Sequence, residues 1–412
     1  MTSELIQVFG RIGLLSFGGP AAQIALMHKE LVETRNWLTE AQFLRALSFC
    51  MLLPGPEAMQ LATYAGWQRA GILGGVIGGG LFVLPGAIVM TLLALAYGQF
   101  GNLPIAQALF LGVKATVVVI VIEAMIKISK RALKTQGHRF IALVAFVALF
   151  AFALPFPLVI AVAALIGAAT STAGKANQSH TPWPLRATCL TLLIGLALWV
   201  APIALIVSSP FLLDIAQFFS TLAVVTFGGA YAVLAYMTQE VVIAHGWLST
   251  PQMMDALGLA ETTPGPLILI TQFVAMIAGM AQGGVAMALA AGVLTLWVTF
   301  IPCFIWIFAG APLIERLDGQ PRLTDALSAI TAAVVGVIAN LSLWFAMHLF
   351  FAEVPTFAFG PFYLHWPALT SIQPAAIGLA LIAGVMLLWR RWPLPLVLLM
   401  TALLSLILTF RQ

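Results

Sequence analysis

Long, uninterrupted apolar runs constrain this chain more than any other feature. Residues 141–169, 190–207, 285–309 and 377–389 contain no charged side chain. Strands of a membrane barrel alternate apolar and polar residues over short segments, which these runs do not. A membrane-crossing helix needs about 20 apolar residues. We therefore expect an all-α, polytopic protein of the lipid bilayer, with about 10–13 transmembrane helices in its 412 residues.

The composition excludes several other classes of protein. Apolar residues make up 62% of the chain and charged residues 8%, whereas a soluble domain has about 45–50% and about 25%. The net charge of +4 is typical of membrane proteins with Lys and Arg in their cytoplasmic loops, so we expect no nucleic-acid partner. Cys50, Cys189 and Cys303 lie in apolar stretches, at no spacing typical of a disulfide or metal site.

The chain contains an internal repeat. A shift of 210 residues aligns Phe17-Gly18-Gly19 with Phe227-Gly228-Gly229 and Pro54-Gly55-Pro56 with Pro264-Gly265-Pro266. Residues 5–66 show 19 identities in 62 positions without a gap, and the similarity continues after a short insertion. We therefore expect a first repeat at 1–135, connecting helices at 136–208, a second repeat at 209–350 and C-terminal helices at 351–412.

Charge placement predicts that the two repeats have opposite orientations. The densest basic cluster, at 127–139, marks a cytoplasmic loop. Three connecting helices and four segments of the second repeat make seven crossings, which places 350–371 outside; that stretch contains no Lys or Arg. These features predict inverted repeats with broken or re-entrant helices. The inference fails if only one Pro-Gly-Pro segment is re-entrant.

The glycine and proline motifs predict broken helices at membrane depth. Proline in a helix interior costs about 3 kcal/mol, and a break exposes a helix N-terminus that attracts anions. Breaks at matching positions of two repeats favour a central transport site over simple packing kinks. The substrate-binding residues expected are Gly18, Gly19, Pro20, Arg45, Pro54, Gly55, Pro56, Glu57, Gln60, Lys114, Gly228, Gly229, Thr263, Pro264, Gly265 and Pro266.

Charged residues near the breaks are candidates for binding, coupling or gating. Arg45 aligns with Asp255, and we expect these two to form an ion pair across the repeats. Lys114 lies within the apolar run 109–122 and is expected either to contact a bound anion or to extend to the membrane interface. The candidates for coupling or gating are Glu30, Glu240, Asp255 and Glu261. For Glu30 and Glu240, the alternative is hydration at the interface.

The chain shows no signature of an enzyme or of an ATP-driven pump. The histidines have no ligand spacing, and the GxxxxGK[ST] loop is absent. No nucleophile lies near a base at a useful spacing. We therefore expect no cofactor, no metal and no catalytic residue, and an ion gradient or the membrane potential as energy source. The sequence is compatible with proton coupling and with a homodimer.

Several motifs resemble the chromate ion transporter family. They are FGGPAAQIALMHKELVETRNWLTEAQF, FCMLLPGPEAMQLATYAGW and LFVLPG in the first half, and TFGGAYAVLAYMTQE, GWLS and ETTPGPL in the second. The resemblance covers nearly the whole chain and matches the long-chain, two-domain members. It implies a bacterial inner-membrane protein that exports chromate and gives resistance, with sulfate as a similar dianion.

The second repeat departs from the first, and the function has alternatives. At the aligned positions of repeat two, Ala230 replaces Pro20, Leu267 replaces Glu57 and Ile270 replaces Gln60. We therefore expect the substrate site to depend more on repeat one. A sulfate or other small-anion uptake carrier or channel is the alternative function. Saturation of the flux and its response to a pH gradient distinguish a carrier from a channel.

Overall fold

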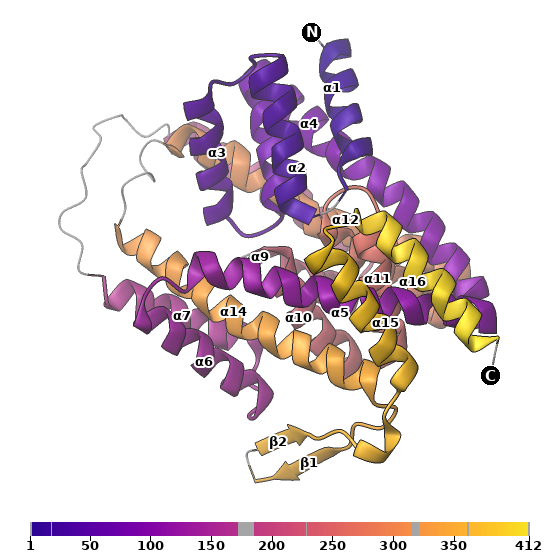
Figure 1. Ribbon diagram of the computed structural model, residues 1–412. Helices are drawn as coiled ribbons and strands as arrows, with labels where there is room; N and C mark the ends of the chain where they lie inside the picture. The colour runs from indigo at the N-terminus through magenta and orange to yellow at the C-terminus, as the bar shows by residue number, and fades with distance from the viewer. Residues whose placement is uncertain are drawn as a thin grey trace. The chain divides into compact units, whose positions relative to one another are not determined.

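The computed structural model describes residues 2–17, 19–171, 185–227, 229–314, 321–360 and 362–410 (Figure 1). Within these ranges the chain is almost entirely helical, and its one sheet is the antiparallel hairpin of β1 (Thr356–Phe359) and β2 (Phe362–His365). The all-α architecture expected from the apolar runs is confirmed.

Two compact units interleave along the sequence. Unit 1 comprises Met1–Gly98, Thr172–Val233 and Ala260–Pro321, and unit 2 comprises Gln99–Ser171, Leu234–Leu259 and Arg322–Gln412. Each unit therefore takes segments from both expected repeats, whose boundaries stay a prediction.

The helices divide between these units. Unit 1 holds all or most of α1 (Thr2–Leu15), α2 (Gly19–His28), α3 (Glu40–Leu52), α4 (Glu57–Phe100), α8 (Leu185–Leu205), α9 (Pro210–Val225) and α12 (Ile270–Gly310). Unit 2 holds α5 (Pro104–Ala132), α6 (Gln136–Phe150), α7 (Phe156–Ala169), α14 (Pro321–Phe350), α15 (Pro374–Gly384) and α16 (Leu394–Thr409). Both units contribute to α10 (Ala230–Thr238) and α11 (Thr250–Thr262). Short 3-10 helices lie at Leu267–Leu269, Ala311–Leu313 and Leu369–Ser371, and π-helices at Lys29–Thr34, Gln239–Ala244 and Val385–Trp389.

Five helical segments of the described chain are long and apolar enough to cross a membrane. They are Glu57–Phe100, Pro104–Ala132, Leu185–Leu205, Leu267–Gly310 and Arg322–Phe350. Six shorter apolar helices accompany them: Gln136–Phe150, Phe156–Ala169, Pro210–Val225, Ala230–Ala244, Pro374–Trp389 and Leu394–Thr409. This content is that of a multi-pass membrane protein.

The helices α4 and α12 are each two helices joined by a glycine kink. Non-helical angles occur at Ala70 and Gly71 in α4, and at Gly283 and Gly284 in α12. In α4 the two arms pack closely, because a Cβ built on Gly66 would lie 2.1 Å from the carbonyl oxygen of Gly74. The first arm, 57–69, rises only about 20 Å and is shorter than the bilayer core.

Matching local structure supports the repeat. Thr39 and Gln42 form a capping box at the start of α3, and Ser249 and Gln252 make the same bonds at the start of α11. The π-helices Lys29–Thr34 and Gln239–Ala244 are also 210 residues apart. The matching caps and π-helices therefore show the same local structure at positions that the 210-residue shift aligns.

The structure locates the short insertion expected in repeat two. The kink glycines Gly71 and Gly284 are 213 residues apart, three more than the shift that aligns the breaks. The 3-10 turn Leu267–Leu269 precedes α12 and has no counterpart before α4. Three extra residues at this turn would align Ile270 with Glu57, whereas Leu267 follows the Pro-Gly-Pro directly, as Glu57 does; the match of Glu57 with Leu267 stays a prediction.

Candidate functional site

The Gly-Gly and Pro-Gly-Pro breaks of both repeats lie in unit 1. The first Gly-Gly motif separates α1 from α2, and the first Pro-Gly-Pro separates α3 from α4. Gly19, Gly55, Gly229 and Gly265 have φ values of 78°, 109°, 96° and 87°. These angles favour glycine, because a Cβ clashes with the backbone there. The predicted helix breaks are therefore present at all four motifs; Gly18 and Gly228 themselves lie outside the described residues.

Each Gly-Gly break is hydrogen-bonded to the Pro-Gly-Pro break of the other repeat. The N–H of Gly265 donates to the carbonyl of Ser16 over 2.8 Å, and the N–H of Gly55 donates to the carbonyl of Thr226 over 3.1 Å. Gly55 and Gly265 are equivalent in the repeat, as are Ser16 and Thr226. The two bonds are thus reciprocal, and they bring together motifs that are far apart in the sequence.

One of these contacts has an additional clamp. Gln23 Nε2 donates to the carbonyl of Gly265 over 2.7 Å, and Gln23 is buried. Repeat two has Val233 at the equivalent position and no such donor. A Cβ on Gly86 would lie 2.3 Å from the carbonyl oxygen of Pro264, so α4 also packs directly on the second break. The two breaks are therefore not equally held.

Two neutral side chains expected near a bound oxyanion, Gln60 and Thr263, hydrogen-bond to the protein backbone, and their role in binding stays a prediction. Gln60 Nε2 donates to the carbonyl of Pro54 over 2.7 Å, and Thr263 Oγ1 donates to the carbonyl of Ala260 over 3.1 Å. Gln60 Oε1 is buried and has no hydrogen-bond partner among the described residues. The thiol of Cys303 lies beside the first break, 2.8 Å from a Cβ built on Gly55. These side chains fix the shape of the breaks.

Two carboxylates flank the second Gly-Gly break. A Cβ built on Gly229 would lie 3.9 Å from Glu57 Oε1, and Tyr231 Oη donates to Glu261 Oε1 over 3.1 Å. Within the described part of the chain, neither carboxylate has a basic side chain within 4.0 Å, and Glu261 is buried. A dianion beside two ionised carboxylates would be strongly repelled. The site therefore suits an anion when these groups are protonated.

Asp255 has a different partner from the expected one. Its Oδ1 lies 2.9 Å from Lys114 Nζ, within unit 2, and both residues are buried. Arg45 is exposed in unit 1, and its expected pairing with Asp255 stays a prediction. Equivalent positions of two repeats touch only near their symmetry axis, which alignment alone does not locate. The alternative in which Lys114 extends to the interface is also not observed.

The equivalent residues Glu30 and Glu240 differ in their surroundings. Glu30 is buried, with its oxygens 3.5 Å from Arg11 Nη1 and 3.6 Å from Arg35 Nε. Glu240 is half-buried in the π-helix Gln239–Ala244, and its carbonyl accepts the N–H of His245 over 2.8 Å. Glu30 is thus engaged in a local network of ion pairs in unit 1.

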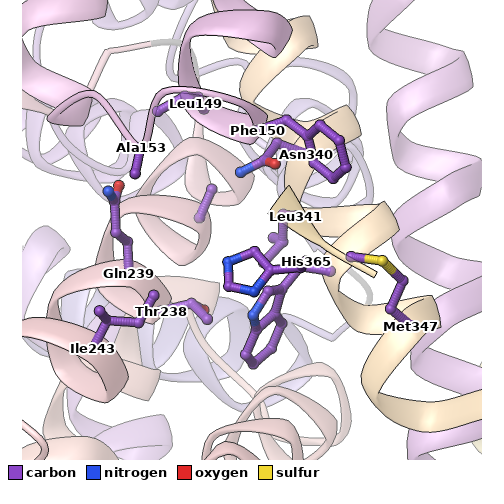
Figure 2. A pocket seen from close by; sticks show the side chains of 12 residues that line it. Leu149, Phe150, Ala153, Thr238, Gln239, Ile243, Asn340, Leu341, Met347 and His365 are labelled. Atoms are coloured by element: carbon purple, nitrogen blue, oxygen red, sulfur yellow. The ribbon is translucent and has the colours of Figure 1, made fainter. Parts of the chain in front are cut away.

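A largely apolar pocket in unit 2 was not expected from the sequence (Figure 2). It lies between the end of α6, the region of α10, α14 and the hairpin. The side chains of Gln239, Asn340 and His365 line it, together with mostly apolar neighbours. The sequence signal was Asn340, an amide in the middle of an apolar run.

No three His, Cys, Asp or Glu side chains gather at metal-binding distance within the described ranges.

Comparison with known proteins identifies the family. The model of the family described as "Chromate transporter" matches residues 3–168 and 213–406. The chain belongs to the chromate transporter family. The two matched segments cover both expected repeats, so the resemblance seen in the motifs is confirmed.

Curated relatives extend over most of the chain. A probable chromate transport protein of Synechococcus elongatus is 31% identical over 388 residues, which cover 93% of this chain and 94% of the relative. A chromate transport protein of Cupriavidus metallidurans is 30% identical over 363 residues, covering 86% and 84%. The uncharacterized transporter YwrA of Bacillus subtilis is 30% identical over 133 residues, 32% of this chain and 75% of that relative. The last match is about one repeat long. No solved structure matches the chain.

Proposed function

We propose that this chain is a secondary transporter that exports chromate across the bacterial inner membrane and thereby gives chromate resistance. Membership of the chromate transporter family and relatives named chromate transport proteins support chromate as the substrate. The observation that carries the site is the pair of reciprocal hydrogen bonds from Gly265 to Ser16 and from Gly55 to Thr226. Breaks that meet in this way form one shared centre from two repeats.

The broken helices provide a suitable place for a small oxyanion. The helices α2, α4, α10 and α12 all begin at or just after a break, and helix N-termini carry free N–H groups and the positive end of the dipole. Reciprocal contacts are what two inverted repeats related by a two-fold axis would produce, and such repeats allow alternating access to one site. We place the substrate between the breaks, within unit 1.

Proton coupling follows from the carboxylates of this centre. Glu57 and Glu261 flank Gly229 and Tyr231 and have no basic partner in the described residues. Chromate at this place is favoured when they carry protons, because ionised carboxylates repel a dianion. Alternating protonation of these groups would then couple anion movement to the proton gradient.

Chromate accumulation in everted membrane vesicles tests the proposal. We expect saturable, pH-gradient-dependent uptake of labelled chromate that Pro54→Ala and Gly55→Leu each reduce at least tenfold, with Arg45→Ala as a charge variant outside the breaks. Unlabelled sulfate serves as competitor. Non-saturating flux that ignores the pH gradient would instead support a channel, and uptake of sulfate but not chromate would support the sulfate carrier. Unchanged accumulation in both break variants would remove the site.

A further inference from the structure

Lys114 of α5 and Asp255 of α11 form a buried ion pair within unit 2. Their charged atoms are 2.9 Å apart, and the side chains are 10% and 0% exposed. A charge at membrane depth is expensive unless it is paired, so each of these residues requires a charge of opposite sign. Neither family membership nor the broken helices of unit 1 account for this pair.

The two helices are held together at the pair. A Cβ built on Gly258, one turn after Asp255, would lie 2.6 Å from Val113 Cγ1. At the residue before Val113, a Cβ on Gly112 would lie 2.2 Å from the carbonyl oxygen of Thr401 in α16. The α5 helix therefore packs against both α11 and α16, and Lys114 has a fixed position against α11.

The ammonium of Lys114 has more hydrogen-bonding capacity than Asp255 uses. An ammonium has three donors, and the ion pair with Asp255 Oδ1 occupies one side of it. The side chain makes no hydrogen bond to any other residue that the structure describes, although Lys114 is more than nine-tenths buried. A buried cation with spare donors suits an acceptor-rich anion.

We propose that Lys114 is a binding site for a tetrahedral oxyanion and that Asp255 occupies it as an internal counter-ion, which the incoming anion displaces. The Asp255 carboxylate neutralises the Lys114 ammonium, and a dianion added beside the ionised pair would leave a net charge of −2 in a buried place. The dianion therefore binds in place of the carboxylate only when Asp255 takes up a proton or is replaced by a neutral residue. The proposal rests on the proposed function only in taking an oxyanion as ligand.

The test asks whether an anion replaces a missing carboxylate. In Asp255→Asn the ammonium has no counter-ion, and sodium sulfate or sodium chromate should restore thermal stability to the purified full chain. We expect the unfolding midpoint to rise by about 5 °C at about 100 times Kd, relative to sodium gluconate of equal ionic strength. Asp214→Asn, an exposed aspartate of α9, is the matched control and should respond no more than the unsubstituted chain.

A second variant keeps the proposal testable if Asp255→Asn does not fold. The double variant Lys114→Met/Asp255→Asn has no buried charge to compensate and should fold, and it should lose whatever stabilisation sulfate or chromate gives to the unsubstituted chain through this site. Retention of the full anion response in the double variant would overturn the proposal, as would an Asp255→Asn chain no more anion-sensitive than Asp214→Asn.

The outcome is separable from that of the transport assay. Anion rescue of Asp255→Asn that disappears in the double variant supports the site whether or not vesicles accumulate chromate. Chromate accumulation together with an anion response that is no larger in Asp255→Asn than in Asp214→Asn supports the proposed function and identifies Lys114–Asp255 as a structural ion pair.

Discussion

The backbone N–H of Gly265 donates to the carbonyl of Ser16 over 2.8 Å, and this bond joins the Pro-Gly-Pro break of one repeat to the Gly-Gly break of the other. Its equivalent, from Gly55 to Thr226, is 3.1 Å long. Backbone groups at broken helices cannot bond to lipid, so at membrane depth they must bond to protein or to water. The reciprocal pairing satisfies part of this requirement and fixes the centre at which we place the substrate.

Replacing the glycines of the Pro-Gly-Pro motifs should abolish transport. Gly55→Ala adds a Cβ 2.8 Å from Cys303 Sγ at a φ of 109°, and Gly265→Ala adds one 3.0 Å from Leu269 Cδ1 at 87°. Such backbone strain costs about 1–3 kcal/mol and would displace the N–H donor. Chromate accumulation in vesicles should fall at least tenfold. Gly80→Ala, where a Cβ meets nothing within 4 Å, is the control and should transport normally.

Removing the Gln23 clamp should weaken one break and leave the other intact. Gln23→Val introduces the residue that repeat two has at the equivalent position, Val233, and leaves the buried carbonyl of Gly265 without its side-chain donor. The expected cost is about 1–3 kcal/mol, measured as a lower midpoint of thermal unfolding in detergent. An unchanged midpoint would show that Gln23 is not needed to hold the break.

The breaks could be predicted from the sequence, because glycine and proline impose local backbone geometry wherever they occur. Glu57 and Glu261 were also predicted to lie near the breaks, since they adjoin the same motifs. The partner of Asp255 could not be predicted: Lys114 is 141 residues away, and only tertiary packing of α5 on α11 brings them together. The 3-10 turn Leu267–Leu269 could not be predicted from the sequence, because its residues are as apolar as the helix that follows.

Glu57→Gln should uncouple chromate movement from the proton gradient. The amide keeps the size of the side chain facing Gly229 but carries neither the charge nor the titrating proton. We expect chromate exchange between the two sides of a vesicle to continue while accumulation driven by a pH gradient falls at least tenfold. Glu33→Gln, at an exposed carboxylate, is the control and should accumulate chromate normally. If gradient-driven accumulation is unchanged in Glu57→Gln, coupling depends on residues other than Glu57.

Glu30→Gln should reduce stability rather than coupling. Its carboxylate lies between Arg11 and Arg35, and Glu30 is buried, so the neutral amide leaves Arg35, which is largely buried, without its counter-ion. We expect a loss of about 1–2 kcal/mol in the free energy of unfolding, since these ion pairs are partly exposed. The ratio of gradient-driven accumulation to exchange should stay as in the unsubstituted chain. A change in that ratio would make Glu30 part of the coupling machinery.

His28 should make stability depend on pH near neutrality. Its Nε2 lies 2.7 Å from Glu40 Oε2 and its Nδ1 lies 3.0 Å from Glu33 Oε1, outside the apolar spans. The hydrogen bond with Glu40, followed by the charge of Glu40 and the contacts of Glu33, raises the pKa of His28 above its usual 6.5. The stabilisation is therefore complete below pH 6.5 and is lost as the pH rises through the higher pKa of the folded chain. Thermal unfolding midpoints between pH 5.5 and 8.5 should fall across this window, and in His28→Gln the fall should be smaller; equal slopes in both chains would contradict the assignment.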